Sequence, residues 1–517
     1  SQETGYAAGG NKNVTVELVD GAGAIACASR AALTPAVSQT LTFTATDNGR
    51  KALGATTVGW AYRELRCRVT DANQAPSVVG CSTDSFAVRP AMFTVSSTAN
   101  ADAAGSNANA TPTIKAGAAF SLTATAVAGY DGTPALDASK TQAHAGAVQT
   151  GVLAGSFPAA NPGTGQATGN AFLYDEVGYF RLDTNGVTDT GFTSVDAAAG
   201  DCTADYSNSP VGGRYGCNFG NDAPTGYFGR FIPDRFDTEI PTPACGAFTY
   251  SGQPFPARIT ARNVAGLTTQ NYAGAFAKNV TFSEVNGNPG SFSLVPLQPA
   301  PSPAFVAGVA DLTNLALAPT LRFTFTNALT APATIRLRAT DAEGVTSATV
   351  EGTTPIRSGR LKIQNAHGSE LRALPLDVTA QFYNGTGFVI NSADNCTTLA
   401  PGNIMMGNWQ RNLTACETGL SGGGTLAGGR LQLPTGSQLR LGPPGAGNDG
   451  SVDLTVRLGA TAGGDATCSD ALPVGPPYAA GIVTSTGATW LQPSPGSDPA
   501  ARATFGIYRD RLIYRRE

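Results

Sequence analysis

The sequence predicts an all-β protein made of tandem Ig-like β-sandwich domains in an elongated, multidomain rod. Apolar and polar residues alternate with a period of two in many short segments. Between these segments lie clusters rich in glycine (63 residues) and proline (33 residues), the residues that form turns. Helical periodicity does not extend beyond about three turns anywhere, and residues 134–146 would hold a short helix at most.

The first clear strand lies in residues 13–20, where Val14, Val16 and Leu18 share one face. Further alternating segments predict strands in residues 41–47, 321–327, 334–341 and 452–460.

Three longer segments resemble one another: residues 119–137, 254–274 and 374–391. Each has an apolar start, an alternating strand, a turn near glycine and a second apolar–polar stretch. They represent either the early strand pair of a sandwich used three times or a chance similarity of short β patterns. The first interpretation, with junctions at "FAVRPAMF" (86–93) and "GTTPIRSGR" (352–360), predicts four domains. These are residues 1–90 (Ig-like), 91–240 (a sandwich with a disulfide-closed insertion), 241–357 (Ig-like) and 358–517 (a sandwich ending in a hairpin).

The predicted terminal hairpin has Arg509 and Asp510 at its turn. Ile507 would then face Leu512, and Phe505 would face Tyr514. The arginines at 509, 511 and 515 would point to solvent or cover a sheet edge, which discourages further strand addition.

Charge and hydropathy exclude several classes of function. The net charge is −4 and no basic block occurs, so nucleic acid is not an expected partner. No apolar run approaches the roughly 20 residues of a membrane-spanning helix. The abrupt start at Ser1, without a signal peptide, indicates a processed or truncated chain.

The nine cysteines are widely spaced and form no CxxC or Cys–His cluster, which disfavours zinc and c-type haem. Their pattern indicates disulfides in an oxidising compartment. Short loops favour Cys67–Cys81, Cys202–Cys217 and Cys396–Cys416 as the pairs. Cys27, Cys245 and Cys468 would be unpaired or take part in long-range bonds. No cofactor or metal is expected.

Two glycine motifs match catalytic or nucleotide-binding patterns, but their surroundings do not. "GLSGG" (419–423) puts Ser421 where a hydrolase nucleophile stands, within a glycine loop rather than a strand–helix elbow. "GAGNDG" (445–450) precedes an alternating segment instead of the helix that a pyrophosphate site needs. Neither motif predicts an enzyme.

The remaining polar candidates favour structural roles. Asp175 and Glu176 are neighbours in a predicted strand and point to opposite faces, so one of them caps a turn or pairs with an arginine such as Arg181. His144 and His367 have no partner at motif spacing. Residues 183–189 offer oxygen ligands suited to calcium but depart from the EF-hand loop, so a plain turn is favoured.

An aromatic, glycine-rich stretch at 201–231 falls partly within the predicted loop Cys202–Cys217. Its rings either form a glycan- or protein-binding surface or fill a small local core. They are Tyr206, Tyr215, Phe219, Tyr227 and Phe228.

Several motifs resemble the C-terminal region of the MshQ family, biogenesis proteins linked to mannose-sensitive haemagglutinin (MSHA) type IV pili of Gram-negative bacteria. They are "VELVD" (16–20), "CSTDSFAVRP" (81–90), "YDEVGYFRL" (174–182), "GRFIPDRFD" (229–237), "CGAFTYSGQPF" (245–255), "GRLKIQNAHGSELRALPL" (359–376) and "ARATFGIYRDRLIYRRE" (501–517). The resemblance implies a secreted or surface-exposed, pilus-associated protein and supplies no active-site residues. Family members commonly carry a lectin-like sandwich before this region, and none is evident here; the terminal motif is also shorter at its turn than the family's.

We therefore expect a structural protein outside the cytosol, exported through the periplasm to the cell surface or beyond. It would associate with MSHA-like pili or form an extracellular filament and support adhesion. The alternative is a tip adhesin that binds glycan or protein, and a glycan hydrolase ranks last. Expected partners are pilus or other surface proteins, with a homopolymer or a glycan as further possibilities.

Overall fold

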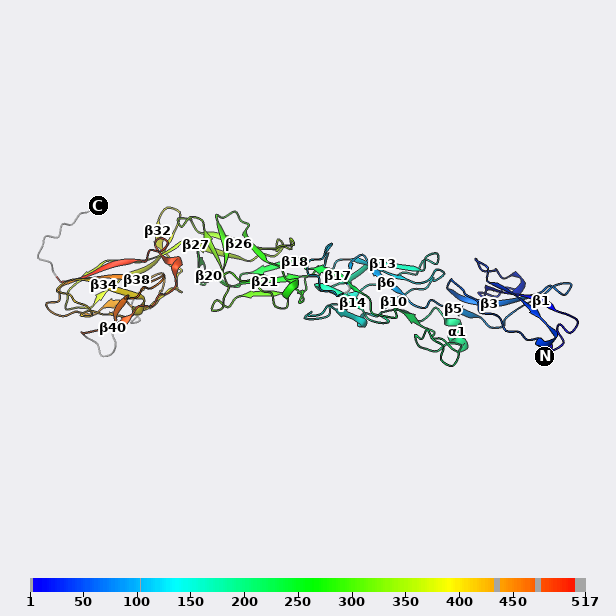
Figure 1. Cartoon of the computed structure of the whole chain (residues 1–517). Coiled ribbons are helices and arrows are strands. Elements are labelled where there is room, and N and C mark those ends of the chain that lie inside the picture. Colours follow the sequence, from blue (N-terminus) through cyan, green and yellow to red (C-terminus); the bar gives the residue numbers. More distant parts are fainter. Residues whose placement is uncertain (1–2, 103, 432–437, 470–475, 507–517) are drawn as a thin grey trace. The chain divides into compact units, whose positions relative to one another are not determined.

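The computed structural model describes residues 3–102, 104–431, 438–469 and 476–506, and β-strands dominate this part of the chain (Figure 1). The strands form mainly antiparallel sheets, so the protein is all-β and built of Ig-like β-sandwich domains. Contacts divide the chain into two compact units: unit 1 is Ser1–Asp234 with Arg262–Phe276, and unit 2 is Arg235–Ala261 with Ala277–Glu517. The four-domain division and the rod stay predictions.

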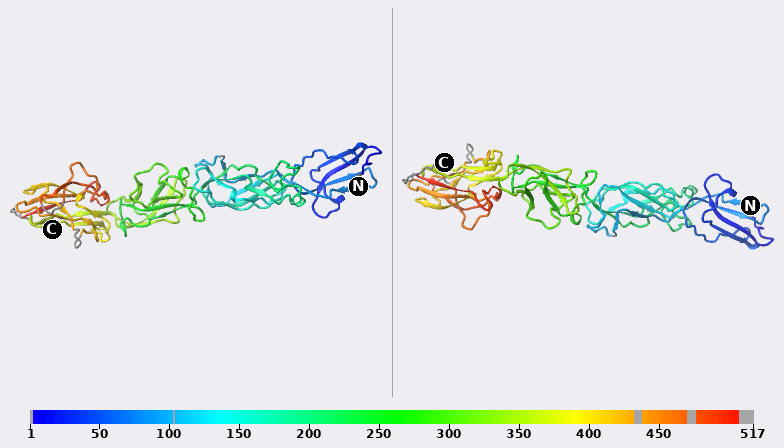
Figure 2. Two further views of the ribbon diagram at one scale, coloured as in Figure 1. Left: turned by 90° about the horizontal axis from the view of Figure 1, so that it is seen from below. Right: turned by 90° about the horizontal axis from the view of Figure 1, so that it is seen from above.

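Unit 1 begins with a five-stranded sheet of order β2-β1-β3-β4, with β5 paired to β3. Its strands are β1 (Lys12–Asp20), β2 (Ser38–Phe43), β3 (Tyr62–Asp71), β4 (Val78–Cys81) and β5 (Phe86–Val88). Val14 and Val16 are buried because period-two alternation puts both on the same face of β1. Figure 2 shows this sheet, in blue, from two further directions.

The rest of unit 1 contains three sheets, of orders β10-β15-β16, β11-β14-β17-β7 with β8 on β17, and β12-β13-β9-β6. Their strands are β6 (Thr94–Ser97), β7 (Asn100–Asp102), β8 (Ile114–Lys115), β9 (Phe120–Thr125), β10 (Ala135–Leu136), β11 (Thr141–Ala143), β12 (Leu153–Ala154), β13 (Gln166–Tyr174), β14 (Gly178–Leu182), β15 (Val187–Asp189), β16 (Phe219–Gly220) and β17 (Tyr227–Ile232). An aromatic core joins them, with Phe120 against Phe231 and Tyr174 against Phe180 at centroid distances of 5.3 and 4.8 Å. Edge-on and tilted ring pairs of this kind add to the stabilisation from burial.

The α-helix α1 (Ser194–Ala199) lies in unit 1 and is six residues long. It stops at Gly200, which takes the left-handed conformation (φ 78°) that glycine adopts without strain. Single 3-10 turns complete the helical content: η1 (Cys27–Ser29), η2 (Ala45–Asp47), η3 (Ala138–Lys140), η4 (Gly274–Phe276), η5 (Pro401–Asn403) and η6 (Thr489–Leu491). None of the helices in the described ranges is long and apolar enough to cross a membrane.

The first part of unit 2 holds three sheets, of orders β18-β21-β24, β19-β27-β26-β22 and β20-β25-β23. Their strands are β18 (Arg235–Glu239), β19 (Thr249–Tyr250), β20 (Pro254–Phe255), β21 (Ala257–Arg262), β22 (Val280–Glu284), β23 (Gly290–Val295), β24 (Val309–Leu312), β25 (Thr320–Phe325), β26 (Ala333–Asp341) and β27 (Thr353–Arg357).

The second part of unit 2 holds sheets of orders β28-β31-β32, β29-β41-β38-β34 and β30-β37-β35-β39-β40, and the pair β33-β36. Their strands are β28 (Gly359–Ile363), β29 (Ala366–Gly368), β30 (Leu374–Pro375), β31 (Val378–Tyr383), β32 (Phe388–Ile390), β33 (Thr398–Leu399), β34 (Ile404–Arg411), β35 (Leu420–Ser421), β36 (Gly424–Thr425), β37 (Arg440–Leu441), β38 (Gly450–Val456), β39 (Ala466–Ser469), β40 (Ala479–Ile482) and β41 (Ala500–Phe505). One core serves this part, and Cys245, Phe248 and Tyr250 belong to it despite their distance in sequence.

The predicted strands are present. The five alternating segments overlap β1, β2, β25, β26 and β38. Two of them extend well beyond the strand: β2 ends at Phe43 and is followed by the 3-10 turn η2 (Ala45–Asp47), and β38 ends at Val456. The three similar segments contain β9, β21 and β31, and each of these strands has a partner from the chain before it: β6, β18 and β28 respectively.

The disulfides partly correct the prediction. Cys202–Cys217 is present, but Cys81 pairs with Cys27 rather than with Cys67. Arg68, not Cys67, lies opposite Cys81 across β3 and β4, so the side chains of Cys67 and Cys81 point to opposite faces of the sheet.

The proposed pair Cys396–Cys416 is also wrong. Cys396 bonds Cys245, and Cys416 bonds Cys468. Both cysteines lie beside the segment that leads into β40: the Tyr478 N–H donates to the Cys416 carbonyl at 2.9 Å, and Cys468 pairs with Ala480. Cys67 remains a free thiol.

The terminal hairpin is wrong at Phe505. Strand β41 has a neighbour on each edge there, because Gly450 pairs with Phe505 from β38 and Gly368 pairs with it from β29. A returning strand therefore finds no free edge opposite Phe505. The other predicted hairpin residues, 507–517, lie outside the described residues.

Candidate ligand-binding site

The loop between Cys202 and Cys217 is the best-defined surface feature that the sequence singled out. The disulfide closes it, and a backbone bridge pairs Thr203 with Gly216 beside the bond. The Thr193 hydroxyl, at the start of α1, donates to the Cys217 carbonyl at 2.8 Å. The base of the loop is thus fixed to the helix by covalent and hydrogen bonds.

Arg89, directly after β5, holds the loop from the other side. Its guanidinium donates to the carbonyls of Gly216 (2.7 Å) and Ser207 (2.8 Å) and to Asn208 Oδ1 (3.0 Å). Burial lowers the pKa of Arg89, and the nearby charge of Asp205 acts against this lowering. A guanidinium held by three acceptors in one loop fixes the loop conformation through its planar donor geometry.

Asp196 in α1 forms the second anchor. Both of its carboxylate oxygens accept from the backbone N–H of Ala87 in β5, each at 3.1 Å. Burial raises the pKa of Asp196, and the charges of Asp201 and Asp84 raise it further, whereas the Ala87 hydrogen bonds lower it. The helix, the loop and β5 therefore form one connected surface.

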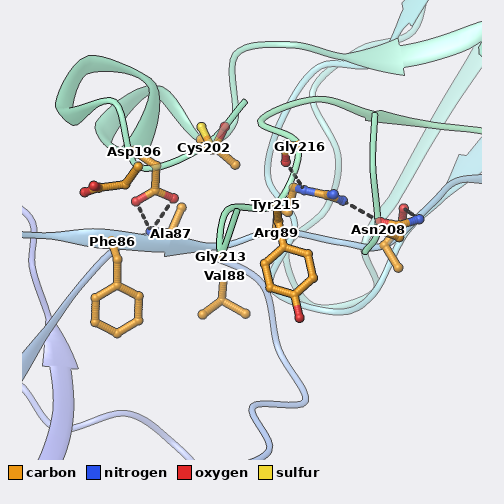
Figure 3. A pocket seen from close by; sticks show the side chains of 13 residues that line it. Phe86, Ala87, Val88, Arg89, Asp196, Cys202, Asn208, Gly213, Tyr215 and Gly216 are labelled. Atoms are coloured by element: carbon orange, nitrogen blue, oxygen red, sulfur yellow. Dashed lines mark hydrogen bonds between the residues drawn. The ribbon is translucent and has the colours of Figure 1, made fainter. Parts of the chain in front are cut away.

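A pocket of about 500 Å³ lies between these three elements. Figure 3 shows Phe86 and Val88 on one side of β5 and Asp196 on the other. Strand alternation puts Phe86 and Val88 on the same face of β5. The side chain of Tyr215 is 53% exposed and contributes an aromatic face. The lining consists of Phe86, Ala87, Val88, Arg89, Ala91, Thr193, Asp196, Asp201, Cys202, Asn208, Gly213, Tyr215 and Gly216.

This lining suits binding better than chemistry. Carbon surface from Phe86 and Val88 and the ring of Tyr215 stand beside carboxylates and an amide. Aromatic rings next to hydrogen-bonding groups are the usual composition of a site for a small polar ligand. Among the described lining residues, the only cysteine is the disulfide-bonded Cys202, and no histidine is present.

The structure separates the five aromatic residues for which the sequence left a binding surface and a local core as alternatives. Tyr215 lines the pocket, and Tyr206 is 37% exposed outside it. Phe219 and Phe228 are buried in the aromatic core of unit 1, so the surface alternative is wrong for these two rings and the core alternative is correct. Tyr227 is half-buried, with the Arg181 guanidinium 5.0 Å from its ring centre.

The carboxylate pair Asp175 and Glu176 lies between β13 and β14 rather than in the predicted strand, and both carboxylates have structural partners. Asp175 accepts from the backbone N–H of Val152 at 2.6 Å. Glu176 is 1% exposed and accepts from the N–H groups of Gln270 (2.8 Å) and Asn271 (3.0 Å). The predicted partner Arg181 instead donates to Gln142.

The two histidines lie in separate structural settings. His144 is buried, and its Nδ1 lies 3.3 Å from the Tyr179 N–H. Burial lowers its pKa. His367 Nε2 lies 3.1 Å from the Gly506 carbonyl oxygen.

The motif residues have local roles. Ser421 lies in β35 and accepts from Arg440 Nε at 3.2 Å. Residues 445–450 lead into strand β38 rather than into a helix. In 183–189, Asp189 accepts from the Tyr130 hydroxyl at 2.6 Å and from two backbone N–H groups, so its oxygens already have protein partners.

Cys245, Asp394 and Cys396 bring possible ligand atoms together in unit 2. Their sulfurs form the disulfide Cys245–Cys396, and a metal prefers thiolates. Asp394 accepts from the Tyr250 hydroxyl (2.7 Å), the Thr397 hydroxyl (2.8 Å) and the Thr397 N–H (3.0 Å). The cluster is a buried structural clamp rather than a metal centre.

The sequence did not reveal Arg89 and Asp196 as site residues. Arg89 lies in a segment predicted as a junction, and its contact with Gly216 spans 127 residues. The hydrogen bond from Ala87 to Asp196 spans 109 residues. Contacts at such separations depend on the fold, and no local pattern indicates them.

Two segments of the chain match models of known protein families. Residues 176–362 match the third domain of DUF6701, and residues 357–517 match its fourth domain. The chain therefore carries two DUF6701 domains over residues 176–517. No protein with a curated description matches the chain.

Solved structures give distant matches. The I-band fragment I67–I69 from titin has 7% identity and a TM-score of 0.21, covering 81% of this chain and 100% of the fragment. The D00–D0 domain of intimin has 12% identity and a TM-score of 0.17, covering 43% and 90%. Cadherin domains 1–4 of protocadherin gamma B7 have 10% identity and a TM-score of 0.18, covering 85% and 82%. At these scores the matches carry no functional conclusion.

Proposed function

We propose that this protein is a structural and adhesive component of the bacterial cell surface, with a ligand site in the pocket beside the 202–217 loop. The β-sandwich architecture and four disulfides support a role outside the cytoplasm. The resemblance to the MshQ family supports association with MSHA-like pili as the finer proposal.

One observation carries the adhesive part of the proposal. Tyr215 is half exposed beside a 500 Å³ pocket, on a loop that a disulfide, Arg89 and Asp196 hold in place. A pre-ordered loop spends little conformational entropy on binding. Exposed tyrosine can stack on the C–H face of a sugar while Asp201 and Asn208 accept from its hydroxyls, so a glycan is the proposed ligand class.

Cell attachment with matched variants tests this proposal. Tyr215→Ala should reduce attachment and glycan-array binding, because it removes the exposed ring from the pocket. Tyr206→Ala is the control, since Tyr206 is exposed on the same loop but does not line the pocket. Equal binding by both variants and the unmodified protein would exclude this pocket as the adhesive site, and binding of a protein but no glycan would reassign its ligand class.

Association with pili is tested separately. The protein should co-purify with sheared pili from cells that make them and should be lost from the surface fraction when the pilin is deleted. Unchanged surface localisation without pilin would contradict the pilus link and leave the ligand site to be judged by its own assay.

A further inference from the structure

The N-terminal sheet of unit 1 has one apolar face. Strand register puts Val14 beside Leu41, Val16 beside Val69 and Leu18 beside Cys67. These residues share one face because side chains alternate along each strand. The opposite face carries Arg68 and Glu17, which form an ion pair at 2.9 Å.

No second sheet from the described residues 3–89 packs on this apolar face. A segment around residues 44–56 covers it in part and leaves two cavities, of about 450 and 210 Å³. Val16, Leu53 and Cys67 line both cavities, which therefore form one apolar groove.

Large apolar side chains remain accessible in and beside this groove. Leu53 is 47% exposed, Val69 is 39% exposed and Val78, on the edge strand β4, is 58% exposed. A β-sandwich normally buries such a face under a second layer of strands about 10 Å away. The groove is therefore a place where an extended apolar segment would complete the layer.

A segment suited to the groove follows β41. Residues 507–517 contain Ile507, Tyr508, Leu512, Ile513 and Tyr514, and the predicted pairing of this segment back onto β41 is blocked at Phe505. At roughly 3.3 Å per residue, an extended segment of this length can reach about 35 Å from its own sheet.

Charge also favours this occupant. Residues 507–517 carry four arginines against one aspartate and one glutamate. The larger cavity of the groove is lined by Glu3 and Asp71, which carry carboxylates, and by one amine, that of Lys51. A cationic strand with apolar side chains therefore complements an apolar groove with an acidic rim.

We propose that the groove binds residues 507–517 of a second copy of this chain in extended form. Such a contact joins two different surfaces, so it repeats from copy to copy and builds a head-to-tail filament. This inference goes beyond the proposed ligand site, because it concerns self-association and does not involve the 202–217 loop.

Cysteine cross-linking in the full-length chain tests the contact. Cys67 is the free thiol in the groove. Single variants Leu512→Cys, Ile513→Cys and Tyr514→Cys are oxidised mildly and separated on non-reducing gels. We expect a ladder beyond the dimer, strong at alternate positions, because an inserted strand turns every second side chain towards the sheet.

The same cysteine variants in a Cys67→Ser background provide the control. They can form at most dimers through the introduced cysteine, so the ladder should disappear. A ladder that persists without Cys67 would overturn the proposal. A disulfide between Cys67 and the introduced cysteine of the same chain would also overturn it, because both thiols are then used within a monomer.

Sedimentation of uncross-linked protein gives an independent measurement. Association should depend on concentration and should be lost in Val69→Arg, which adds a cation to the groove, and in the chain shortened to residue 506. Thr40→Arg is the matched control, because Thr40 is an exposed residue paired with Thr15 on the opposite face of the same sheet. A full-length chain that stays monomeric at high concentration, with its fold verified by circular dichroism, would overturn the proposal whatever the adhesion assay shows.

Discussion

Each unit contains a buried carboxylate that fastens a segment distant in sequence, but the two arrangements differ. In unit 1, Glu176 accepts from the backbone of residues 270 and 271, which lie more than 90 positions away. In unit 2, Asp394 accepts from the Tyr250 hydroxyl, 144 positions away. Only the second carboxylate lies beside a disulfide, Cys245–Cys396.

The surroundings of the two carboxylates also differ in chemistry. The contact of Glu176 with residues 270 and 271, the unit 1 clamp, has amide side chains around it. Gln149 Nε2 donates to Glu176 at 2.7 Å, and Asn271 Oδ1 accepts from the Val148 N–H at 2.8 Å. The unit 2 clamp is aromatic: Arg357 lies 4.7 Å from the ring centres of Phe248 and Phe382 and donates to Asn391, which in turn donates to the Tyr250 hydroxyl.

This comparison shows that a covalent bond and a hydrogen-bonded carboxylate do similar work in different ways. The disulfide limits the unfolded chain, whereas the carboxylate stabilises one folded arrangement by satisfying buried donors. Unit 2 combines both contributions at one place and unit 1 relies on hydrogen bonds, so the unit 2 clamp should resist opening more strongly.

Removal of the unit 2 disulfide should have the largest effect. We expect Cys245→Ser with Cys396→Ser to lower the free energy of unfolding of unit 2 by about 4 kcal/mol, because the bond closes a loop of 151 residues. Trp409 and Trp490 pack against this core, and the third tryptophan, Trp60, lies in unit 1. In a Trp60→Phe background, tryptophan fluorescence in denaturant therefore follows unit 2. The double variant Cys202→Ser with Cys217→Ser, which opens a loop with a separation of 15, should leave that transition in place.

Loss of the Asp394 charge should be the next largest effect. Asp394→Asn keeps the shape but points an amide group at donors, and we expect a cost of about 3 kcal/mol in the same fluorescence transition. Combined with loss of the disulfide, the two costs should not add, because both changes act on one contact network. Full additivity would show that the bond and the carboxylate act independently.

Glu176→Gln should cost less, about 2 kcal/mol, since its donors are neutral backbone and amide groups and no hydroxyl group. Hydrogen exchange provides a local measurement: the amides of Gln270 and Asn271 should exchange roughly thirtyfold faster in the variant. Unchanged protection of these two amides would show that the segment is held by packing of Tyr272 and Phe276, both buried, rather than by the carboxylate.

The sequence was sufficient for the strands and insufficient for the contacts between them. Alternation identified β1 and β26 because the period of side chains along a strand is local. Alternation could not exclude the disulfide Cys67–Cys81. Whether the two cysteines lie on the same face of the sheet depends on the register between β3 and β4, which the alternation within one strand does not determine.

The candidate site shows the same limit. The composition of 201–231 indicated an aromatic loop and its disulfide, and Tyr215 does line a pocket. Composition cannot separate Tyr215 from Phe219, which is 1% exposed, because burial depends on which sheet covers the ring. The anchors Arg89 and Asp196 likewise act through contacts more than 100 positions apart.

The smallest expected effect distinguishes the two clamps by pH. His144 packs on Phe276 with ring centres 4.4 Å apart, on the segment that Glu176 fastens, and burial lowers its pKa below the usual value of about 6.5. As the pH falls below about 6.5, His144 is protonated in the unfolded chain but stays neutral in the folded chain. The free energy of unfolding of unit 1 should therefore decrease, by at most about 1.4 kcal/mol per pH unit. His144→Gln should flatten this dependence between pH 6.5 and 5, and hydrogen exchange of Gln270 and Asn271 should report it. The hydrogen-bond partners of Asp394 include no histidine, but unit 2 contains His367. In a His367→Gln background, the tryptophan transition of unit 2 should therefore stay constant over the same range, and an equal loss in both units would remove the distinction.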